Sequence, residues 1–170
     1  MKHPGNSVAV TRMELADKMF FRLYQCANML HKTGTRAVED PGLITQQWAV
    51  LGALSRPEAI DGMSVGDRAR YLLVSRQNLS GLISRMERNR HLHSAQDGRD
   101  KRSRLITMTE SGKEIWDNQA IPRIHEYYEL ALAEHSVGDM THTLHYLLKV
   151  LENMKRLDDE SAAADGEDAI

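Results

Sequence analysis

Residues 75–108, SRQNLSGLISRMERNRHLHSAQDGRDKRSRLITM, decide the fold of this chain. The segment predicts a helix first, because Ser75 is a good N-cap and the apolar residues after it recur at helical spacing. They are Leu79, Ile83 and Met86. Residues 91–95 and 105–108 then have the composition of two short strands, and Asp97-Gly98 between them is a turn signal. The segment therefore predicts a helix followed by a two-stranded hairpin.

A shorter helix is predicted immediately before this segment. Ser64 and Asp67 form the S-x-x-D pattern of a capping box, which opens a helix over about residues 65–72. Only Leu73 and Val74 separate it from the next N-cap. Two short helices joined by a tight turn and followed by a hairpin are typical of a winged helix-turn-helix.

Positive charge is concentrated in the same part of the chain. Ten Lys or Arg and three Asp or Glu lie between Arg68 and Arg104, whereas the whole chain has a formal net charge of −2. Such a distribution favours binding of a polyanion, and double-stranded DNA fits a helix beside a basic hairpin. The helix offers groups that bond base edges, and the hairpin tip offers cations for phosphates or a narrow minor groove. The candidate DNA-binding residues are Ser75, Arg76, Gln77, Asn78, Ser80, Ser84, Arg85, Arg88, Arg99, Lys101, Arg102 and Arg104.

Long amphipathic helices are predicted on both sides of the winged segment. Residues 11–44 and 109–157 carry apolar side chains at helical spacing, over more of the helix surface than one small core needs. We expect these residues to form a helical dimerisation region, with the winged helix-turn-helix at residues 45–108. We expect residues 1–10 to be a flexible arm and the acidic residues 158–170 to be a disordered tail. The predicted fold class is therefore mainly α, with a small β-hairpin wing.

Two local features of the flanking helices are also predicted. Thr45 is expected to cap a helix that ends before Arg56-Pro57. Pro122 lies inside the apolar pattern of residues 109–157, so we expect a kink or a break there.

Several classes of protein are excluded by the sequence. A single cysteine excludes an intramolecular disulfide framework. No apolar run approaches the roughly 18 residues of a membrane span. The first ten residues also lack the apolar core of a signal peptide. We therefore expect a cytoplasmic protein without a membrane partner. No phosphate-binding glycine loop, nucleophile elbow or zinc-hydrolase motif is present, so we expect neither an enzyme nor a cofactor.

Other functions remain open at this point. His91 and His93 alternate on a predicted strand, so both are expected to face one side of it. His142 and His145 are three residues apart on a predicted helix, a spacing that can hold zinc. Cys26 is a candidate redox switch, although cysteines in an apolar stripe usually act as small hydrophobes. An architectural DNA-binding protein is a further alternative, and it would show no preference for one operator. A metal-responsive or redox-responsive regulator and an architectural protein thus stand beside a ligand-responsive regulator.

The run over residues 64–112 resembles the MarR (multiple antibiotic resistance regulator) family of winged-helix transcription factors. The most specific part is the wing, where the D-x-R pattern appears as Asp100-Lys101-Arg102. The L-T-x-x-G pattern follows as Met108-Thr109-Glu110-Ser111-Gly112, with Met in place of Leu. One departure is Asn89-Arg90, where a Gly usually follows the recognition helix. The order of predicted helices fits the family over roughly residues 11–157.

The resemblance implies a homodimer whose first and last helices interdigitate, with recognition helices in successive major grooves of a pseudo-palindromic operator. It also implies a repressor that leaves DNA when a small molecule, often an anionic aromatic or phenolic compound, binds among the first, second and fifth helices. Arg22 or His31 would then face the anion. The candidate lining residues are Arg22, Tyr24, Met29, His31, Trp48 and Met63, with Trp116 and Tyr127 as weaker candidates.

The predicted wing can be tested with one substitution. Arg102→Ala should lower DNA affinity for all sequences alike and reduce the slope of log affinity against log salt by about one, because one phosphate contact is lost. Equilibrium binding to duplex DNA at several salt concentrations measures both quantities. An unchanged affinity at moderate salt would remove Arg102 from the DNA interface.

Overall fold

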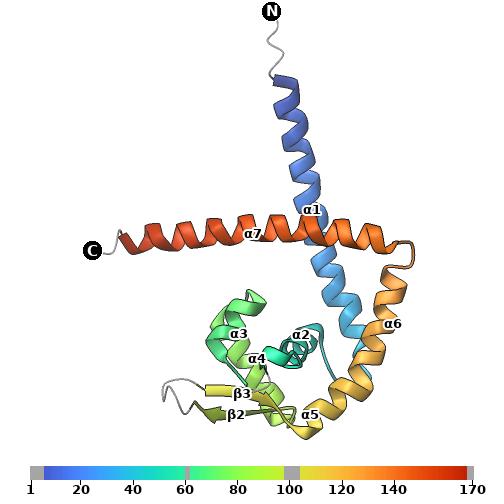
Figure 1. Cartoon of the computed structure of the whole chain (residues 1–170), viewed down its shortest axis with the longest axis vertical. Helices are drawn as coiled ribbons and strands as arrows, with labels where there is room; N and C mark the ends of the chain where they lie inside the picture. Colours follow the sequence, from blue (N-terminus) through green and yellow to red (C-terminus); the bar gives the residue numbers. More distant parts are fainter. Residues whose placement is uncertain (1–5, 60–61, 98–103, 168–170) are drawn as a thin grey trace, which may run out of the picture. The chain divides into compact units, whose positions relative to one another are not determined.

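The computed structural model describes residues 6–59, 62–97 and 104–167, and it divides into two compact units, residues 1–127 and 128–170. We describe each unit by itself. In this part of the chain no helix is both long enough and apolar enough to cross a membrane. The first unit contains, in chain order, α1 (Asn6–Ala37), α2 (Thr45–Leu54), β1 (Met63–Ser64), α3 (Val65–Leu72), α4 (Arg76–Arg88), β2 (Leu92–Gln96), β3 (Arg104–Met108), α5 (Glu110–Ile115) and most of α6 (Ile121–Ala131) (Figure 1). The second unit contains the end of α6 and α7 (Val137–Glu167).

The predicted helix-turn-helix is confirmed as α3 and α4. The Ser64 hydroxyl accepts a hydrogen bond of 3.0 Å from the Asp67 N–H, and the Ser75 hydroxyl accepts one of 3.2 Å from the Asn78 N–H. Each serine thereby satisfies a backbone donor in the first turn of its helix. Between the helices Leu73 adopts a left-handed conformation with φ 54°, which turns the chain within three residues.

The wing is a three-stranded antiparallel sheet in the order β1-β3-β2. β2 pairs with β3 from Leu92 opposite Met108 to Gln96 opposite Arg104, as the predicted hairpin requires. The short strand β1, which adds Met63 opposite Ile106, was not predicted. Two residues are too few to show an alternating pattern, so this strand depends on its partner rather than on its own sequence.

The core lies between α4, the sheet and the helices around them. Leu79, Ile83 and Met86 of α4 are buried, as their spacing predicted, and Leu82 joins them. They belong to one apolar cluster with residues of α2, β2, β3 and the α5–α6 segment. The other members of this cluster are Val38, Leu43, Val50, Leu51, Leu54, Ala69, Leu92, Ile106, Trp116, Ala120 and Ile124. α4 is therefore held rigidly on its inner side, while its outer side is exposed.

The end of the wing is joined to the end of α4 by a very close backbone contact. A Cβ atom at Gly112 would lie 2.1 Å from the His91 carbonyl oxygen, so only glycine fits at this position. The Thr109 N–H donates to the same carbonyl at 3.1 Å, and the Thr109 hydroxyl caps α5 by accepting from the Gly112 N–H at 2.9 Å. The Thr and the Gly of the L-T-x-x-G pattern therefore both contact the His91 carbonyl, and together they form a joint that holds the start of α5 against the chain that follows α4.

Arg90 occupies the position after α4 where glycine is usual in the resembling family. Its φ is 61°, a left-handed conformation, and its N–H donates to the Glu87 carbonyl at 2.9 Å. The His91 N–H donates to the Met86 carbonyl at 2.9 Å, which completes a Schellman motif. The departure in sequence therefore leaves the usual helix end unchanged but places a side chain where it is strained.

Several predicted boundaries differ from the structure. α1 begins at Asn6, although residues 1–10 were expected to be a flexible arm, and α7 continues to Glu167, although disorder was expected from residue 158. The alanines at 162–164 are strong helix formers, which outweighs the acidic composition of that segment. Near Pro122, α5 and α6 are joined by a π-helical turn at Trp116–Ala120, which supplies the expected interruption.

Thr45 does not cap α2 as predicted. Ile44 is the N-cap, and its N–H donates to the Gln47 side chain at 3.0 Å. The buried Thr45 hydroxyl instead donates to the His31 carbonyl of α1 at 3.1 Å and lies 2.9 Å from the Thr35 hydroxyl. This residue therefore joins α1 to α2.

Arg68 of α3 has a fully buried side chain, with 0% of its surface exposed. Its Nη2 atom donates to the Ile106 carbonyl of β3 at 3.3 Å, while Nε and Nη1 have no hydrogen-bond partner in the described residues. Burial lowers the pKa of the Arg68 guanidinium to about 10. A buried cation with one hydrogen bond is a source of instability in the winged unit.

Arg90→Gly should stabilise the protein by up to about 1 kcal/mol, because glycine adopts the left-handed conformation without strain. The greater conformational freedom of glycine in the unfolded chain offsets only part of this gain. The matched control is Asn89→Gly, since Asn89 has φ −79° and offers no strain to relieve. Urea unfolding at constant m value measures both variants. A loss of stability in Arg90→Gly would show that the arginine side chain makes a stabilising contact.

Arg68→Met should leave the free energy of unfolding unchanged or raise it by about 1–4 kcal/mol, because an apolar side chain of similar length replaces a buried cation. Arg68→Ala should instead destabilise the protein, because it leaves a cavity. Thermal and urea unfolding of both variants test this expectation. A Met variant less stable by more than about 2 kcal/mol would mean that the guanidinium is better satisfied than its contacts indicate.

Candidate nucleic-acid interface

The outermost row of side chains on α4 lies opposite the core. Gln77, Gly81, Ser84 and Arg88 are spaced by four, three and four residues, which places them on one helical face, and all four are exposed. A Cβ atom at Gly81 would meet no atom within 4 Å, so open space surrounds this point of the helix. Amide, hydroxyl and guanidinium groups around a residue without a side chain can approach base edges and phosphates closely. This outer row is the best candidate for the surface that enters a major groove.

A second row of α4 is turned toward other parts of the first unit. The Arg76 guanidinium lies over Gly66 of α3, where a Cβ atom would be 3.4 Å from its Nη2 atom. Near the other end of α4, Glu87 forms an ion pair of 3.8 Å with Arg104 of β3. Ser80 donates its hydroxyl proton to the Arg76 carbonyl at 2.8 Å. Arg76 and Arg104 therefore remain exposed but are held against the protein.

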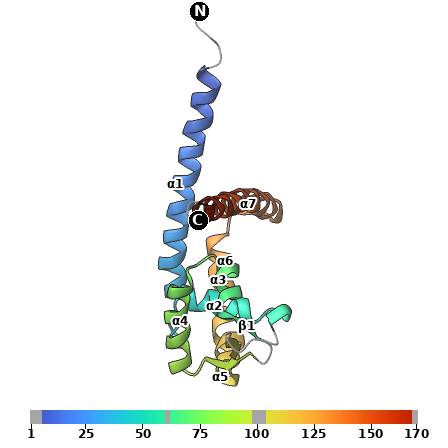
Figure 2. The ribbon, with the colours of Figure 1, turned by 90° about the vertical axis from the view of Figure 1, so that its left-hand side faces the viewer.

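The third row of α4 lines a groove. Asn78, Leu82 and Arg85, spaced by four and three residues, face a groove of about 560 Å³ that α1 and α2 also line. In Figure 2 α4 lies below the lower end of α1. The full lining is Leu30, His31, Thr45, Gln46, Ala49, Leu72, Val74, Asn78, Leu79, Leu82 and Arg85. Two residues predicted to bind DNA, Asn78 and Arg85, are thus placed beside α1 and α2.

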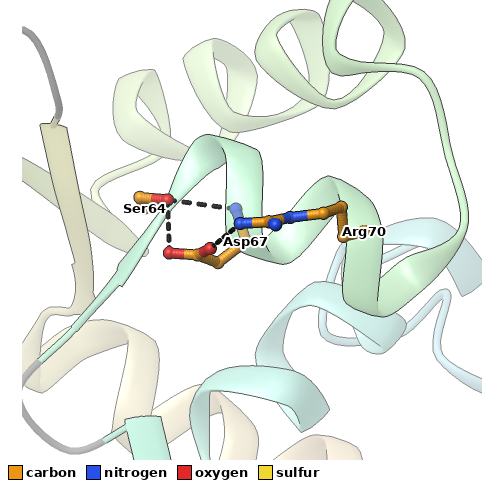
Figure 3. A network of polar contacts seen from close by, with 3 residues as sticks. All are labelled: Ser64, Asp67 and Arg70. Atoms are coloured by element: carbon orange, nitrogen blue, oxygen red, sulfur yellow. Dashed lines mark hydrogen bonds and ion pairs between the residues drawn. The ribbon is translucent and has the colours of Figure 1, made fainter.

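The start of α3 carries a network of three polar side chains (Figure 3). The Ser64 hydroxyl donates to the Asp67 carboxylate at 2.7 Å, and the Arg70 guanidinium forms an ion pair with the same carboxylate. The Ser64 hydrogen bond, followed by that of Arg70, lowers the pKa of the Asp67 carboxyl below its ordinary value. The shift favours the ionised carboxylate, which pairs with the exposed Arg70 side chain.

Two exposed cations near the helix-turn-helix were not among the predicted site residues. Arg70 extends from α3, and Arg56, which follows α2, lies 5.0 Å from the centre of the Tyr71 ring in a cation–π contact. The spacing of Asp67 and Arg70 by three residues on a helix indicates their pairing. No pattern in the sequence indicates the stacking of Arg56 on Tyr71. Arg68, by contrast, adds to the basic count of the sequence but not to the surface.

The tip of the wing lies outside the described residues. The predictions for Arg99, Lys101 and Arg102 fall there, and they stay predictions. At the edges of the described wing, Gln96 and Arg104 are paired across β2 and β3.

The predicted effector-binding residues are spread over the first unit. Only His31 lines the groove, while Tyr24 and Met29 are exposed on α1 and the Arg22 guanidinium donates to Gln25 at 2.5 Å. Trp48 lies edge-on to Tyr127, with 6.2 Å between the ring centres, and Met63 pairs with Ile106 in the sheet. The structure thus gathers a different set around the groove, with four residues from α4 itself. Asn78 and Arg85 border this groove because of how α4 packs beside α1 and α2, and no pattern in the sequence indicates that position.

The residues that suggested metal or redox sensing are not brought together. Among the described residues no three His, Cys, Asp or Glu side chains are placed to hold a metal ion. His91 precedes β2 and is buried, whereas His93 is exposed, so the expectation that both face one side is wrong. Burial lowers the pKa of His91. Cys26 is exposed on α1.

Comparisons with known proteins agree with this architecture. A family profile described as the MarR family matches residues 42–103. The transcriptional activatory protein BadR of Rhodopseudomonas palustris is 65% identical over 164 residues, which cover 94% of each chain. The homoprotocatechuate degradative operon repressor of Escherichia coli is 28% identical over 110 residues, which cover 65% of this chain and 72% of the repressor.

A solved structure of similar fold is that of S. aureus MepR in complex with DNA. It superposes with a TM-score of 0.70 and 19% identity, over 79% of this chain and 96% of MepR. At this identity the likeness concerns the fold, and the fold is that of a mainly helical winged helix-turn-helix protein.

Proposed function

This chain belongs to the MarR family of DNA-binding transcriptional regulators, and we propose that it acts as a homodimer at a pseudo-palindromic operator under the control of a small anionic aromatic effector. The observation that carries the DNA-binding part is the exposed row Gln77, Gly81, Ser84 and Arg88 on a helix whose inner side is packed. The proposed site of action is the cytoplasm.

The homodimer is supported by apolar side chains that the single chain leaves exposed on α1 and α7. On α1 these are Met13, Leu15, Met19, Phe20, Phe21, Tyr24, Met29 and Leu30. On α7 they are Val137, Met140, Leu144, Tyr146, Leu147, Leu148, Met154 and Leu157. Exposed apolar surface of this extent is rare on monomers and marks an interaction surface. A second copy of the chain would cover it, and two copies would present two recognition helices to one operator.

The effector class is supported by the relative named for a homoprotocatechuate degradative operon, since homoprotocatechuate is a dihydroxylated aromatic acid. The direction of regulation is supported by the relative of 65% identity, whose name is that of an activatory protein. We therefore favour activation of the target genes, with repression, which the family resemblance implied, as the alternative. An effector that prefers one dimer conformation by about 2–3 kcal/mol would change operator affinity about 30–150-fold.

The dimer can be tested on α7. Leu144→Arg should produce monomers and weaken binding to a two-site operator at least about tenfold, because the half-sites would no longer be bound by one linked molecule. His142→Arg is the matched control, since residue 142 lies about half a turn around α7 from Leu144. Sedimentation velocity and fluorescence anisotropy measure the two effects. A dimeric Leu144→Arg variant with unchanged affinity would contradict this interface.

Footprinting on genomic fragments separates a regulator from an architectural protein. We expect protection of one discrete palindrome, because two fixed recognition helices select one spacing. Uniform protection along the DNA would instead support an architectural role. Transcription in vitro from the protected promoter, with and without the protein, then decides between activation and repression.

A further inference from the structure

The polar network at the start of α3 extends to α4 through a second arginine. The Arg70 guanidinium forms an ion pair with the Asp67 carboxylate, and Arg76 is close enough to interact with the same carboxylate electrostatically. Arg76 is the first residue of α4, whereas Arg70 lies in the last turn of α3. Two arginines from two helices are therefore placed around one carboxylate.

We propose that Asp67 is a positioning residue for DNA binding, which holds Arg70 and Arg76 ready for the phosphates at one edge of the major groove. We call Arg70 and Arg76 the arginine pair. This inference rests on the proposed entry of the outer row of α4 into a major groove, and it requires neither the dimer nor the effector.

Gly66 gives Arg76 its place on α3. A Cβ atom at residue 66 would lie 3.4 Å from Nη2, 3.6 Å from Cζ and 3.7 Å from Nε of Arg76. Because these three atoms are nearly equidistant from one point, the guanidinium lies face-on to residue 66. Residues 66 and 70 are four positions apart on a helix, so both members of the arginine pair lie along one face of α3.

This face of α3 lies where a row of phosphates is expected. Arg76 precedes Gln77 of the outer row by one residue and is turned from it by about 100° around α4. A helix with its side chains is about 10–12 Å across and the major groove is about 12 Å wide, so α4 would fill the groove. The flanks of α4 would then face the phosphates on either side, and the arginine pair lies on one flank.

The contacts of Asp67 hold Arg70 and still leave it donors for a phosphate. The Ser64 hydroxyl donates to one carboxylate oxygen at 2.7 Å, while Nη2 of Arg70 donates to the other (Figure 3). A guanidinium has five N–H donors, of which Nε and Nη1 of Arg70 carry three. The Arg70 side chain is 76% exposed, so a phosphate can reach it. An arginine that is already restrained loses less freedom when it binds.

Asp67 is also an anion, which by itself repels DNA. Its removal therefore has two effects of opposite sign, because it lessens this repulsion and releases the arginine pair. Repulsion between separated charges is screened over about 8 Å at 0.15 M salt, whereas the loss of a positioned contact persists there. We expect the loss of positioning to dominate at this salt concentration.

The arginine pair is tested by fluorescence anisotropy on the full chain with a mixed-sequence duplex of about 20 base pairs, two helical turns. Arg70→Met should bind about fivefold more weakly at 0.15 M salt and reduce the salt slope by about one, because one phosphate contact is lost. Arg56→Met is the matched control, since exposed Arg56 stacks on Tyr71, which is turned about 100° from Arg70 around α3. It should keep the wild-type slope, and equal slope changes in both variants would overturn the inference.

The positioning role is tested on Asp67 with the same duplex. Asp67→Asn should bind at least about threefold more weakly at 0.15 M salt, because two long side chains are released. Asp67→Glu should bind as the wild type does, since Glu at this place in a capping box also pairs with a residue three positions on. Tighter binding by Asp67→Asn at 0.15 M salt would overturn the inference.

A double-mutant cycle separates positioning from a merely structural role. Asp67→Asn should cost less affinity in the Arg70→Met background than in the wild type, because one of the two arginines that it positions is already gone. A change in α3 itself would weaken binding equally in both backgrounds. Additive losses would therefore contradict the positioning role.

These experiments fail separately from those on the proposed function. Phosphate contacts carry no sequence information, so the mixed-sequence duplex reports on the arginine pair without an operator. A wild type that protects no discrete palindrome would contradict the proposed regulator, while the salt slopes would still decide on the arginine pair. A discrete footprint together with an unchanged slope in Arg70→Met would overturn this inference alone.

Discussion

The approach of Gly112 to the His91 carbonyl is the constraint on which the winged unit depends. One carbonyl oxygen at the end of α4 accepts from the Thr109 N–H and lies where a Gly112 Cβ would be. Any larger residue would separate α5 from α4, and with it the wing strand β3 that leads into α5. The joint therefore sets the angle between α4, the recognition helix, and the wing. The chain continues from the same joint into α5 and α6.

The surface of α4, the helix held by this joint, has four sides with different surroundings. Its inner side packs into the core, and its outer row of Gln77, Gly81, Ser84 and Arg88 is exposed. One flank contacts α3 and β3 through Arg76 and Glu87, and the other lines the groove. A helix of 13 residues has room for these rows because 3.6 residues per turn place every third or fourth residue on a common face.

Electrostatic interactions in the unit depend on burial more than on the number of charges. Arg68 is fully buried and contributes no charge to the surface, while Arg70, two residues further along α3, and Arg56, stacked on Tyr71, are exposed. The hydrogen bonds of Ser64 and Arg70 lower the pKa of the Asp67 carboxyl, and the Asp67 carboxylate forms an ion pair with Arg70 on the surface of α3. A count of basic residues thus identifies the region of the DNA interface without identifying its members.

The sequence alone determined the features that depend on neighbours three or four residues away. The serine caps of α3 and α4, the burial of Leu79, Ile83 and Met86, and the β2–β3 hairpin all follow from local spacing. Only the tertiary structure decided that Arg68 is buried, that β1 joins the sheet and that Asn78 and Arg85 line a groove. Each of these depends on a partner far along the chain, such as the Ile106 carbonyl that receives the Arg68 hydrogen bond. Contacts of this kind have no period in the sequence, because their partners are brought together by packing.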